Sequence, residues 1–210
     1  MVMRDQGHLA MDRLFWVVSQ AARLVSEGRE VLLVSSGAVG LGRNQLGLPG
    51  PLDLTSKQAC AAVGQNLLMD AYRDLFARHG LKTAQVLISP DDFSSRRTYL
   101  HLEKTLERLL DLGVVPVINE NDTISVAELE DWTAGRSFGD NDKLSALVAS
   151  KLGANPLVIL TDVDGIYTRD PATDPAAERI PVIESHRATQ AIQTAGRSYP
   201  GRGGMATKLE

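Results

Sequence analysis

Two aspartates flank an asparagine in the stretch "SFGDNDKLSALVASKLG", residues 137–153. Asp140, Asn141 and Asp142 stand just before apolar residues at helical spacing, so we expect them at the first turn of a buried helix. One such residue is enough to accept the free N–H groups of a helix start and to suit the positive end of the helix dipole. The run of polar residues therefore favours a second task, such as binding a cation, in addition to capping.

A second polar cluster, "NENDT" at residues 119–123, directly follows an apolar run. This cluster and the first one offer oxygen atoms that suit a substrate ammonium group, a metal ion or a lysine side chain that pairs with them. The residues of this group are Asp122, Asp140 and Asp142 with Asn119 and Asn141. The spacing of the acidic residues matches no EF-hand loop. The sequence predicts a site for a positively charged group and leaves these three alternatives open.

The stretch "SSGAVGLG", residues 35–42, is rich in glycine and lies between a predicted strand and a predicted helix. Such a loop lets backbone N–H groups approach an anion, with help from the helix dipole, and Ser36 adds a hydroxyl beside Gly37 and Ala38. The glycines are not spaced as in a dinucleotide-binding loop, and no acidic residue ends a following strand about 20 residues later. A tight turn without a ligand explains the glycines as well as an anion site does.

Two later segments are weaker candidates for a functional role. Thr161 and Asp162 follow an apolar run and begin a turn-rich loop, although the dipeptides of that loop are also ordinary turn residues. The segment "RGGMATK" resembles no P-loop, but its flexible glycines could wrap phosphates while its lysine holds charge on a transferring group. The alternative is a solvent-facing lysine after a turn. The candidates in this segment are Arg202, Gly203, Gly204, Met205, Ala206, Thr207 and Lys208.

The elements that position these residues repeat a simple order along the chain. An amphipathic helix ends at a glycine, an apolar run follows, and a polar cluster comes next. Because the apolar runs are short, β-branched and not alternating, they predict parallel strands that are buried on both faces. The predicted helices cover about 9–28, 56–80, 95–113 and 141–153, and the predicted strands are "REVLLV", "KTAQVLI", "VVPVI" and "PLVIL". The segment "ATDPAAERIP" is expected to be a loop.

This order predicts an α/β fold with a mostly parallel central sheet that is sandwiched by helices. Each polar cluster comes directly after a strand, so all of them should lie at the carboxyl edge of the sheet, where open α/β sheets bind ligands. Ser36, Asp122, Asp140 and Asp162 could therefore share one cleft although they are far apart in sequence.

The composition excludes several classes of protein. The formal net charge is −4, and no basic stripe is interleaved with aromatic residues, so we expect no nucleic-acid partner. The scattered histidines and the single Cys60 have no metal-ligand spacing, so we expect no zinc site, and we expect Cys60 to be a small buried residue. The lone cysteine and the absence of a membrane-length apolar run indicate a cytoplasmic protein without a membrane partner.

Taken together, the motifs resemble those of the glutamate 5-kinases, which belong to the amino-acid kinase superfamily. The resemblance runs from about residue 9 to the end of the chain. It implies ATP-dependent phosphorylation of the γ-carboxylate of glutamate to γ-glutamyl phosphate for proline biosynthesis, with Mg²⁺ carried by ATP and a homo-oligomeric full-length enzyme. The motifs that carry it are "VSSGAVGLG", "KQACAAVGQ", "VPVINENDT", "FGDNDKLSALVA", "LTDVDGIYTRDP" and "GRGGMATKLE".

The resemblance also implies roles for individual residues. Lys208 would stabilise the phosphoryl group during transfer, and Asp142 would orient catalytic lysines. Glutamate would be bound by Ser36, Gly37, Ala38, Asp122, Asp140 and Asn141, and the nucleotide by Thr161, Asp162 and the segment 202–208. Phosphoryl transfer needs mainly alignment and positive charge on the moving oxygens, which these residue types supply.

Two departures from the family pattern shape the remaining expectations: the phosphate-loop lysine at the start is missing, and the sequence ends at Glu210, before the final strands and helices of the family's nucleotide lobe. The family begins with a strand that carries a Lys-x-Gly-x-Ser/Thr phosphate loop, whereas "MVMRDQGHLA" leads into a predicted helix without that lysine. We therefore expect a glutamate-binding lobe over 1–153, a partial nucleotide-binding lobe over 154–210, and little activity of this fragment alone, because losing one such donor costs about 3–4 kcal/mol. The alternatives are a non-catalytic binding remnant and another carboxylate kinase of the same superfamily.

Overall fold

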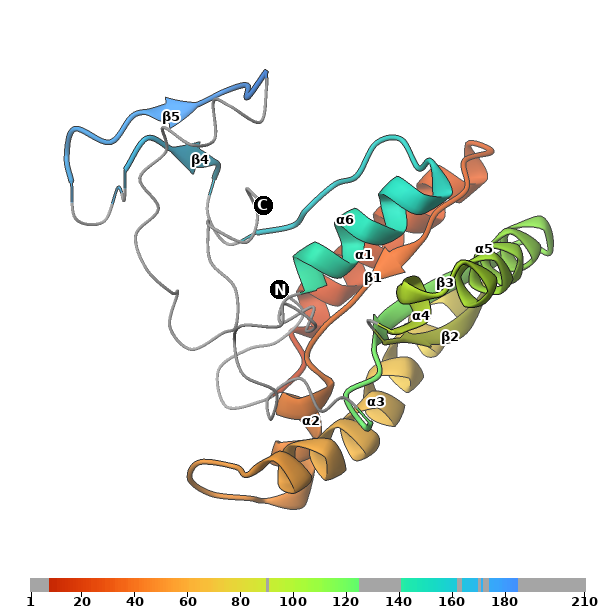
Figure 1. Cartoon of the computed structure of the whole chain (residues 1–210), viewed down its shortest axis with the longest axis vertical. Helices are drawn as coiled ribbons and strands as arrows, with labels where there is room; N and C mark the ends of the chain where they lie inside the picture. Colours follow the sequence, from red (N-terminus) through yellow and green to blue (C-terminus); the bar gives the residue numbers. More distant parts are fainter. Residues whose placement is uncertain are drawn as a thin grey trace. The chain divides into compact units, whose positions relative to one another are not determined.

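The fold is described from a computed structural model of the chain (Figure 1), which forms two compact units, residues 1–141 and residues 142–210. The structure describes residues 8–89, 91–124, 141–161, 164–169, 171 and 174–184.

The first unit contains a parallel sheet. Its strands are β1 (Leu33–Val34), β2 (Lys82–Ile88) and β3 (Val114–Glu120), in the spatial order β1-β3-β2. Because β3 is the central strand, its residues pair with both neighbours, and Val117 lies opposite Leu33 on one side and Gln85 on the other. The predicted parallel α/β arrangement is confirmed for these strands.

Helices connect and cover the strands. In the first unit they are α1 (Met11–Ser26), α2 (Ala38–Leu46), α3 (Leu54–Ala77), α4 (Asp91–Ser94) and α5 (Arg96–Asp111). At the boundary of the two units α6 (Asn141–Leu152) begins, and the second unit also contains the antiparallel pair β4 (Ile166–Tyr167) and β5 (Arg179–Ile180). No helix in the described part of the chain is long and apolar enough to cross a membrane.

The core of the first unit lies between the sheet and two long helices. Leu14 and Val18 of α1 and Leu68 and Phe76 of α3 are fully buried and pack in one cluster with Val117 of β3. Neighbouring residues of a strand point to opposite faces, so the other face of β3 remains for α5, which packs against that strand (Figure 1). The sheet is thus covered by helices on both faces, as predicted.

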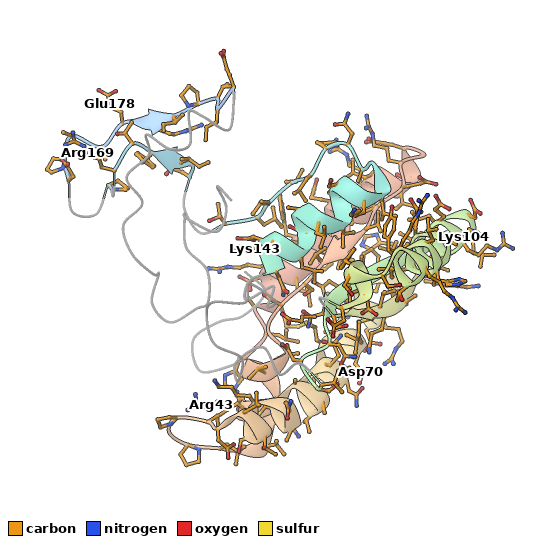
Figure 2. All side chains as sticks on the ribbon, viewed as in Figure 1. Arg43, Asp70, Lys104, Lys143, Arg169 and Glu178 are labelled. Carbon is orange, nitrogen blue, oxygen red and sulfur yellow. The ribbon has the colours of Figure 1, made fainter. Side chains whose placement is uncertain are left out.

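Local signals set the ends of the helices. Asp53 caps α3 by accepting the backbone N–H of Ser56 at 2.8 Å, a typical N-cap bond. Arg43, in the last turn of α2, donates to the carbonyl oxygens of Leu48 and Gly50 at 3.0 and 2.8 Å and so fixes the loop that follows (Figure 2). The predicted glycine stops after α1, α3, α5 and α6 are confirmed, because all four glycines have positive φ angles; they are Gly28, Gly80, Gly113 and Gly153.

The predicted strand "PLVIL" at residues 156–160 was wrong. This segment forms neither helix nor strand, and Leu157, Val158 and Leu160 are 41%, 70% and 51% exposed. An apolar run becomes a strand only where a neighbouring strand accepts and donates its backbone hydrogen bonds, and no strand of the described residues pairs with this one. "REVLLV" was also predicted too long, because only Leu33 and Val34 pair with β3.

Two segments that were expected to be loops contain regular structure. The glycine-rich stretch 35–42 is helical from Ala38 onward, because it forms the first turns of α2. The turn-rich segments around 161–171 and 172–181 contribute β4 and β5, in which Ile166 lies opposite Ile180. Both short strands were missed because a two-residue strand carries too little sequence to show a period.

Candidate functional site

The carboxyl ends of β1 and β3 lie side by side and bring predicted polar residues together. The backbone N–H of Ser35, directly after β1, donates to the carbonyl oxygen of Ile118 on β3 at 2.8 Å. This pairing places Ser35 and Ser36 next to Asn119, which is 2% exposed near the end of β3. Ser36 itself is exposed, as a residue that contacts a ligand must be.

Asn141 joins both strand ends through its side-chain amide. Its Nδ2 donates to the carbonyl oxygen of Ser35 at 2.7 Å and to Oδ1 of Asn119 at 3.1 Å. These bonds join residues that are 106 and 22 positions apart in sequence. Asn141 therefore reaches the carboxyl edge of the sheet, as predicted. Because the nitrogen donates both bonds, the group that Asn141 offers to a ligand is the acceptor Oδ1.

A buried network of hydrogen bonds holds the residues that Asn141 contacts. Asn119 Nδ2 donates to Oε1 of Gln65 on α3 at 2.9 Å, and Asn119 Oδ1 also accepts the backbone N–H of Glu120 at 2.9 Å. Directly after the neighbouring strand β1, the hydroxyl group of Ser35 is hydrogen-bonded to the hydroxyl group of Tyr72 on α3 at 2.9 Å. Burial raises the pKa of the Tyr72 phenol, and the bond to Ser35 partly opposes that rise.

The start of α2 is held against α3 by close packing of backbones. Gly37 occupies the N-cap of α2 with φ 107° and makes no side-chain capping bond, and Ala38 begins the helix and is buried. A Cβ atom on Gly42 would lie 1.8 Å from the carbonyl oxygen of Cys60, so only glycine fits at this crossing. Cys60 is fully buried there, which confirms its predicted role as a small core residue.

Comparison with known proteins decides the family. A family model described as the amino acid kinase family matches residues 10–210. The chain belongs to this family. It is 49% identical over 197 residues to a glutamate 5-kinase of Myxococcus xanthus, which covers 93% of this chain and 50% of that protein. It is 47% identical over 210 residues to a glutamate 5-kinase of Thermus thermophilus, which covers 99% of this chain and 54% of that protein.

The chain spans about half the length of the curated relatives it matches. The resemblance that the motifs carry is confirmed by these relatives. Among solved structures, the T. acidophilum isopentenyl phosphate kinase product complex matches with a TM-score of 0.47 and 23% identity, covering 78% of this chain and 68% of that one.

For this member of the amino acid kinase family, the structure describes some of the predicted site residues. Asp122 is half-buried in the turn that follows β3. Asp142 is half-buried in the first turn of α6, where its carbonyl oxygen accepts the hydroxyl of Ser145 at 2.7 Å, and Thr161 is exposed outside any helix or strand. Both belong to the second unit. Asp140, Asp162 and residues 202–208 lie outside the described residues, and their roles stay predictions.

Gln65 and Tyr72 were not predicted from the sequence. They lie on the buried face of α3 with Leu68 and Leu75, at the spacing of residues that share one side of a helix. A glutamine in the middle of an apolar stripe is the only local signal, and it does not tell which distant group the amide binds. Asn119 was recognised as part of the polar cluster, but its buried position became clear only with the pairing of β3.

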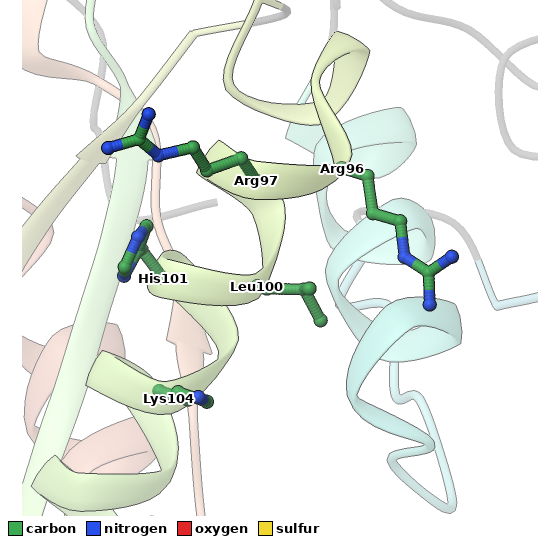
Figure 3. A pocket seen from close by; sticks show the side chains of 5 residues that line it. All are labelled: Arg96, Arg97, Leu100, His101 and Lys104. Atoms are coloured by element: carbon green, nitrogen blue, oxygen red, sulfur yellow. The ribbon is translucent and has the colours of Figure 1, made fainter.

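A cavity of about 490 Å³ lies elsewhere, along the first turns of α5. Its lining consists of Arg96, Arg97, Leu100, His101 and Lys104, which all come from that helix. Figure 3 shows Arg97 and His101 projecting from one side of α5 and Arg96 and Leu100 from the other, so these side chains do not converge on a common point. No group of three or more histidine, cysteine or acidic residues suited to a metal ion occurs in the described part of the chain.

Proposed function

We propose that this chain carries the glutamate-binding part of a glutamate 5-kinase, which phosphorylates the γ-carboxylate of glutamate with ATP in the first step of proline biosynthesis. The main support is the Asn141 amide, whose nitrogen is committed to Ser35 and Asn119. The Oδ1 atom of Asn141 remains as a hydrogen-bond acceptor for a ligand, and a substrate ammonium group is a suitable donor to it. The similarity to glutamate 5-kinases over nearly the whole chain supports the same substrate.

In this proposal, different elements of the chain bind the α-ammonium group and a carboxylate group of glutamate. Asn141, together with the carboxylates of Asp122 and Asp140, binds the α-ammonium group. A carboxylate group of the bound glutamate lies against Ser36 and the start of α2, where no side chain caps the first N–H groups of the helix. The segment of Gly37 and Ala38 allows this approach because its glycine carries no side chain.

The reactive groups belong to the later part of the chain. Mg-ATP is the second substrate, and its metal neutralises charge on the phosphate oxygens. Thr161, Asp162 and residues 202–208 bind the nucleotide, Lys208 stabilises the transferring phosphoryl group, and Asp142 orients that lysine. Such a site acts by alignment and electrostatics, because phosphoryl transfer requires little covalent help from the protein.

Calorimetric titration tests the substrate assignment. L-Glutamate should bind the chain, and glutarate, which lacks only the ammonium group, should bind at least tenfold more weakly, because that factor corresponds to about one lost hydrogen bond to a charged group. Asn141→Ala should weaken glutamate binding by a similar factor and leave glutarate binding unchanged. Equal affinity for glutamate and glutarate would refute ammonium recognition, and preference for aspartate or N-acetylglutamate would indicate another carboxylate kinase.

Phosphoryl transfer is tested separately. A hydroxamate assay with glutamate and Mg-ATP should give little product with this chain, and any product that does depend on glutamate should disappear in Lys208→Ala. Glutamate binding without any binding of an ATP analogue would favour the second candidate, a non-catalytic glutamate-binding module.

A further inference from the structure

The amide of Asn119 has only one possible orientation. Its Oδ1 accepts the backbone N–H of Glu120, and a backbone N–H can only donate. Nδ2 of Asn119 must therefore face Gln65, and Gln65 must present Oε1 as the acceptor at 2.9 Å. The same reasoning fixes Asn141, because the carbonyl oxygen of Ser35 accepts only from its Nδ2.

The bond from Asn119 to Gln65 leaves another polar atom of Gln65 buried and unpaired. It is 6% exposed, and its Nε2 has no hydrogen-bond partner among the described residues. Burying an unpaired donor destabilises a fold, and an apolar residue such as methionine would fill the same space without that penalty. The useful atom of Gln65 is therefore Oε1, which holds Asn119 with its own oxygen toward Asn141.

Tyr72 lies seven residues after Gln65, two turns along the same face of α3. Its hydroxyl binds the hydroxyl of buried Ser35 at 2.9 Å, and Ser35 supplies the other oxygen that accepts from Asn141. One helix thus reaches the residues at both strand ends, Asn119 through Gln65 and Ser35 through Tyr72. Each of those residues in turn binds one N–H of Asn141.

We infer that Gln65 and Tyr72 are positioning residues: α3 uses them to fix the two acceptors that orient the Asn141 amide with its oxygen toward the ligand. Neither residue touches the ligand. Without Gln65, the Asn119 amide loses the partner of its Nδ2 and is held only through its Oδ1, so it keeps the orientation that serves Asn141 less tightly. Selectivity for a substrate ammonium would then depend on residues of the buried face of α3, a consequence that rests on the proposed function.

The first test needs no ligand. In the wild-type chain, both side-chain N–H protons of Asn141 should exchange slowly with water in NMR spectra, relative to the exposed amide of Asn66. Gln65→Met should speed this exchange at least tenfold, because it removes the acceptor and keeps the volume. Gln65→Glu should retain slow exchange, because a carboxyl oxygen accepts from Asn119 in either protonation state. Unchanged exchange in Gln65→Met would overturn the inference.

A matched control separates positioning from loss of stability. Leu68→Ala removes a buried side chain from the same helix without touching a polar group, so it should lower stability and leave the exchange of the Asn141 amide, relative to that of Asn66, as in the wild type. Faster exchange in both Gln65→Met and Leu68→Ala would mean that general loosening of α3 is the cause, and would overturn the inference.

The second test is a double-mutant cycle on glutamate binding. Gln65→Met should weaken binding about tenfold in the wild-type chain and have no further effect in the Asn141→Ala background. An equal loss in both backgrounds would show that Gln65 does not act through Asn141. If the wild-type chain binds no glutamate, the proposed function fails, whereas the exchange experiment still decides whether Gln65 positions the amide.

Discussion

A Cβ atom on Gly64 would lie 1.8 Å from the carbonyl oxygen of Ala38, so α3 and α2 meet where there is no room for a side chain. Ala38 is the first residue of α2 and follows Ser36 and Gly37, the predicted glutamate-binding segment. Gln65, the neighbour of Gly64, holds Asn119 at the end of β3. One turn of α3 therefore locates both the start of α2 and the polar end of the central strand.

Gly64→Ala should destabilise the chain and weaken glutamate binding together. The added methyl group meets backbone atoms that cannot rotate away, so the two helices must separate, at a cost of about 3 kcal/mol. Urea denaturation should show a lower midpoint. Asn66→Ala, at an exposed position of the same helix, should raise stability slightly through its helix propensity. Equal midpoints for Gly64→Ala and the wild type would contradict the close helix contact.

Asn141→Asp should be more harmful than Asn141→Ala. The amide nitrogen faces two acceptors, the Ser35 carbonyl at 2.7 Å and Asn119 Oδ1 at 3.1 Å. Aspartate places an oxygen there, which loses both bonds and adds repulsion, whereas alanine only loses the bonds. We expect Asn141→Asp to lower the free energy of unfolding by about 2–3 kcal/mol and Asn141→Ala by about 1–2 kcal/mol. Thermal unfolding at pH 7 measures both, and the reverse order would contradict the assigned amide orientation.

Tyr72→Phe should change how stability depends on alkaline pH. Burial raises the pKa of Tyr72 above its ordinary value of 10.0, so the folded chain holds this proton more tightly than the unfolded chain. The resulting stability is fully present below about pH 10 and is lost as pH rises through the folded-state pKa. Tyr72→Phe should therefore lose stability less steeply above pH 10 than the wild type.

At pH 8 the same variant should be less stable by about 1 kcal/mol, because the Ser35 hydroxyl loses its buried partner. Urea denaturation at pH 8 and at several values above pH 10 measures both effects. Tyr99→Phe is the comparison, because Tyr99 is less buried and its pKa is raised mainly by the hydrogen bond to Glu103 on its own helix. If Tyr72→Phe flattens the alkaline slope no more than Tyr99→Phe does, burial of Tyr72 is not the main cause.

The sequence predicted the elements whose signals are local. Helical spacing of apolar residues and glycine stops were enough for α1, α3, α5 and α6, and the β-branched runs were enough for β2 and β3. The placement of the polar residues that follow β1 and β3 at one edge also followed, because parallel strands bring their carboxyl ends together, and Asn141 reaches that edge through Ser35 and Asn119.

Features that depend on distant partners could not be predicted in this way. Whether residues 156–160 form a strand depends on a neighbouring strand, and nothing within the run reports one. Gly42 indicates a loop by composition, yet it lies inside α2, where the backbone of Cys60 leaves no room for a side chain. The role of Gln65 is defined by a residue 54 positions later, which no local pattern encodes.

Arg96→Glu should stabilise the chain, although it reverses a surface charge. Arg96 and Arg97 occupy the first turn of α5, which contains no acidic residue, so positive side chains stand at the positive end of the helix dipole. A glutamate there should raise the free energy of unfolding by about 0.3–1 kcal/mol at low salt. Arg108→Glu, in the last turn of the same helix, should lower it, because Arg108 suits the negative end and pairs with Asp111 at 3.7 Å. Urea denaturation at low and high salt measures both changes in the free energy of unfolding. Both changes should become smaller at high salt, because salt screens the interaction with the dipole. If both substitutions shift stability in the same direction, the change in net charge outweighs the position of each arginine along α5.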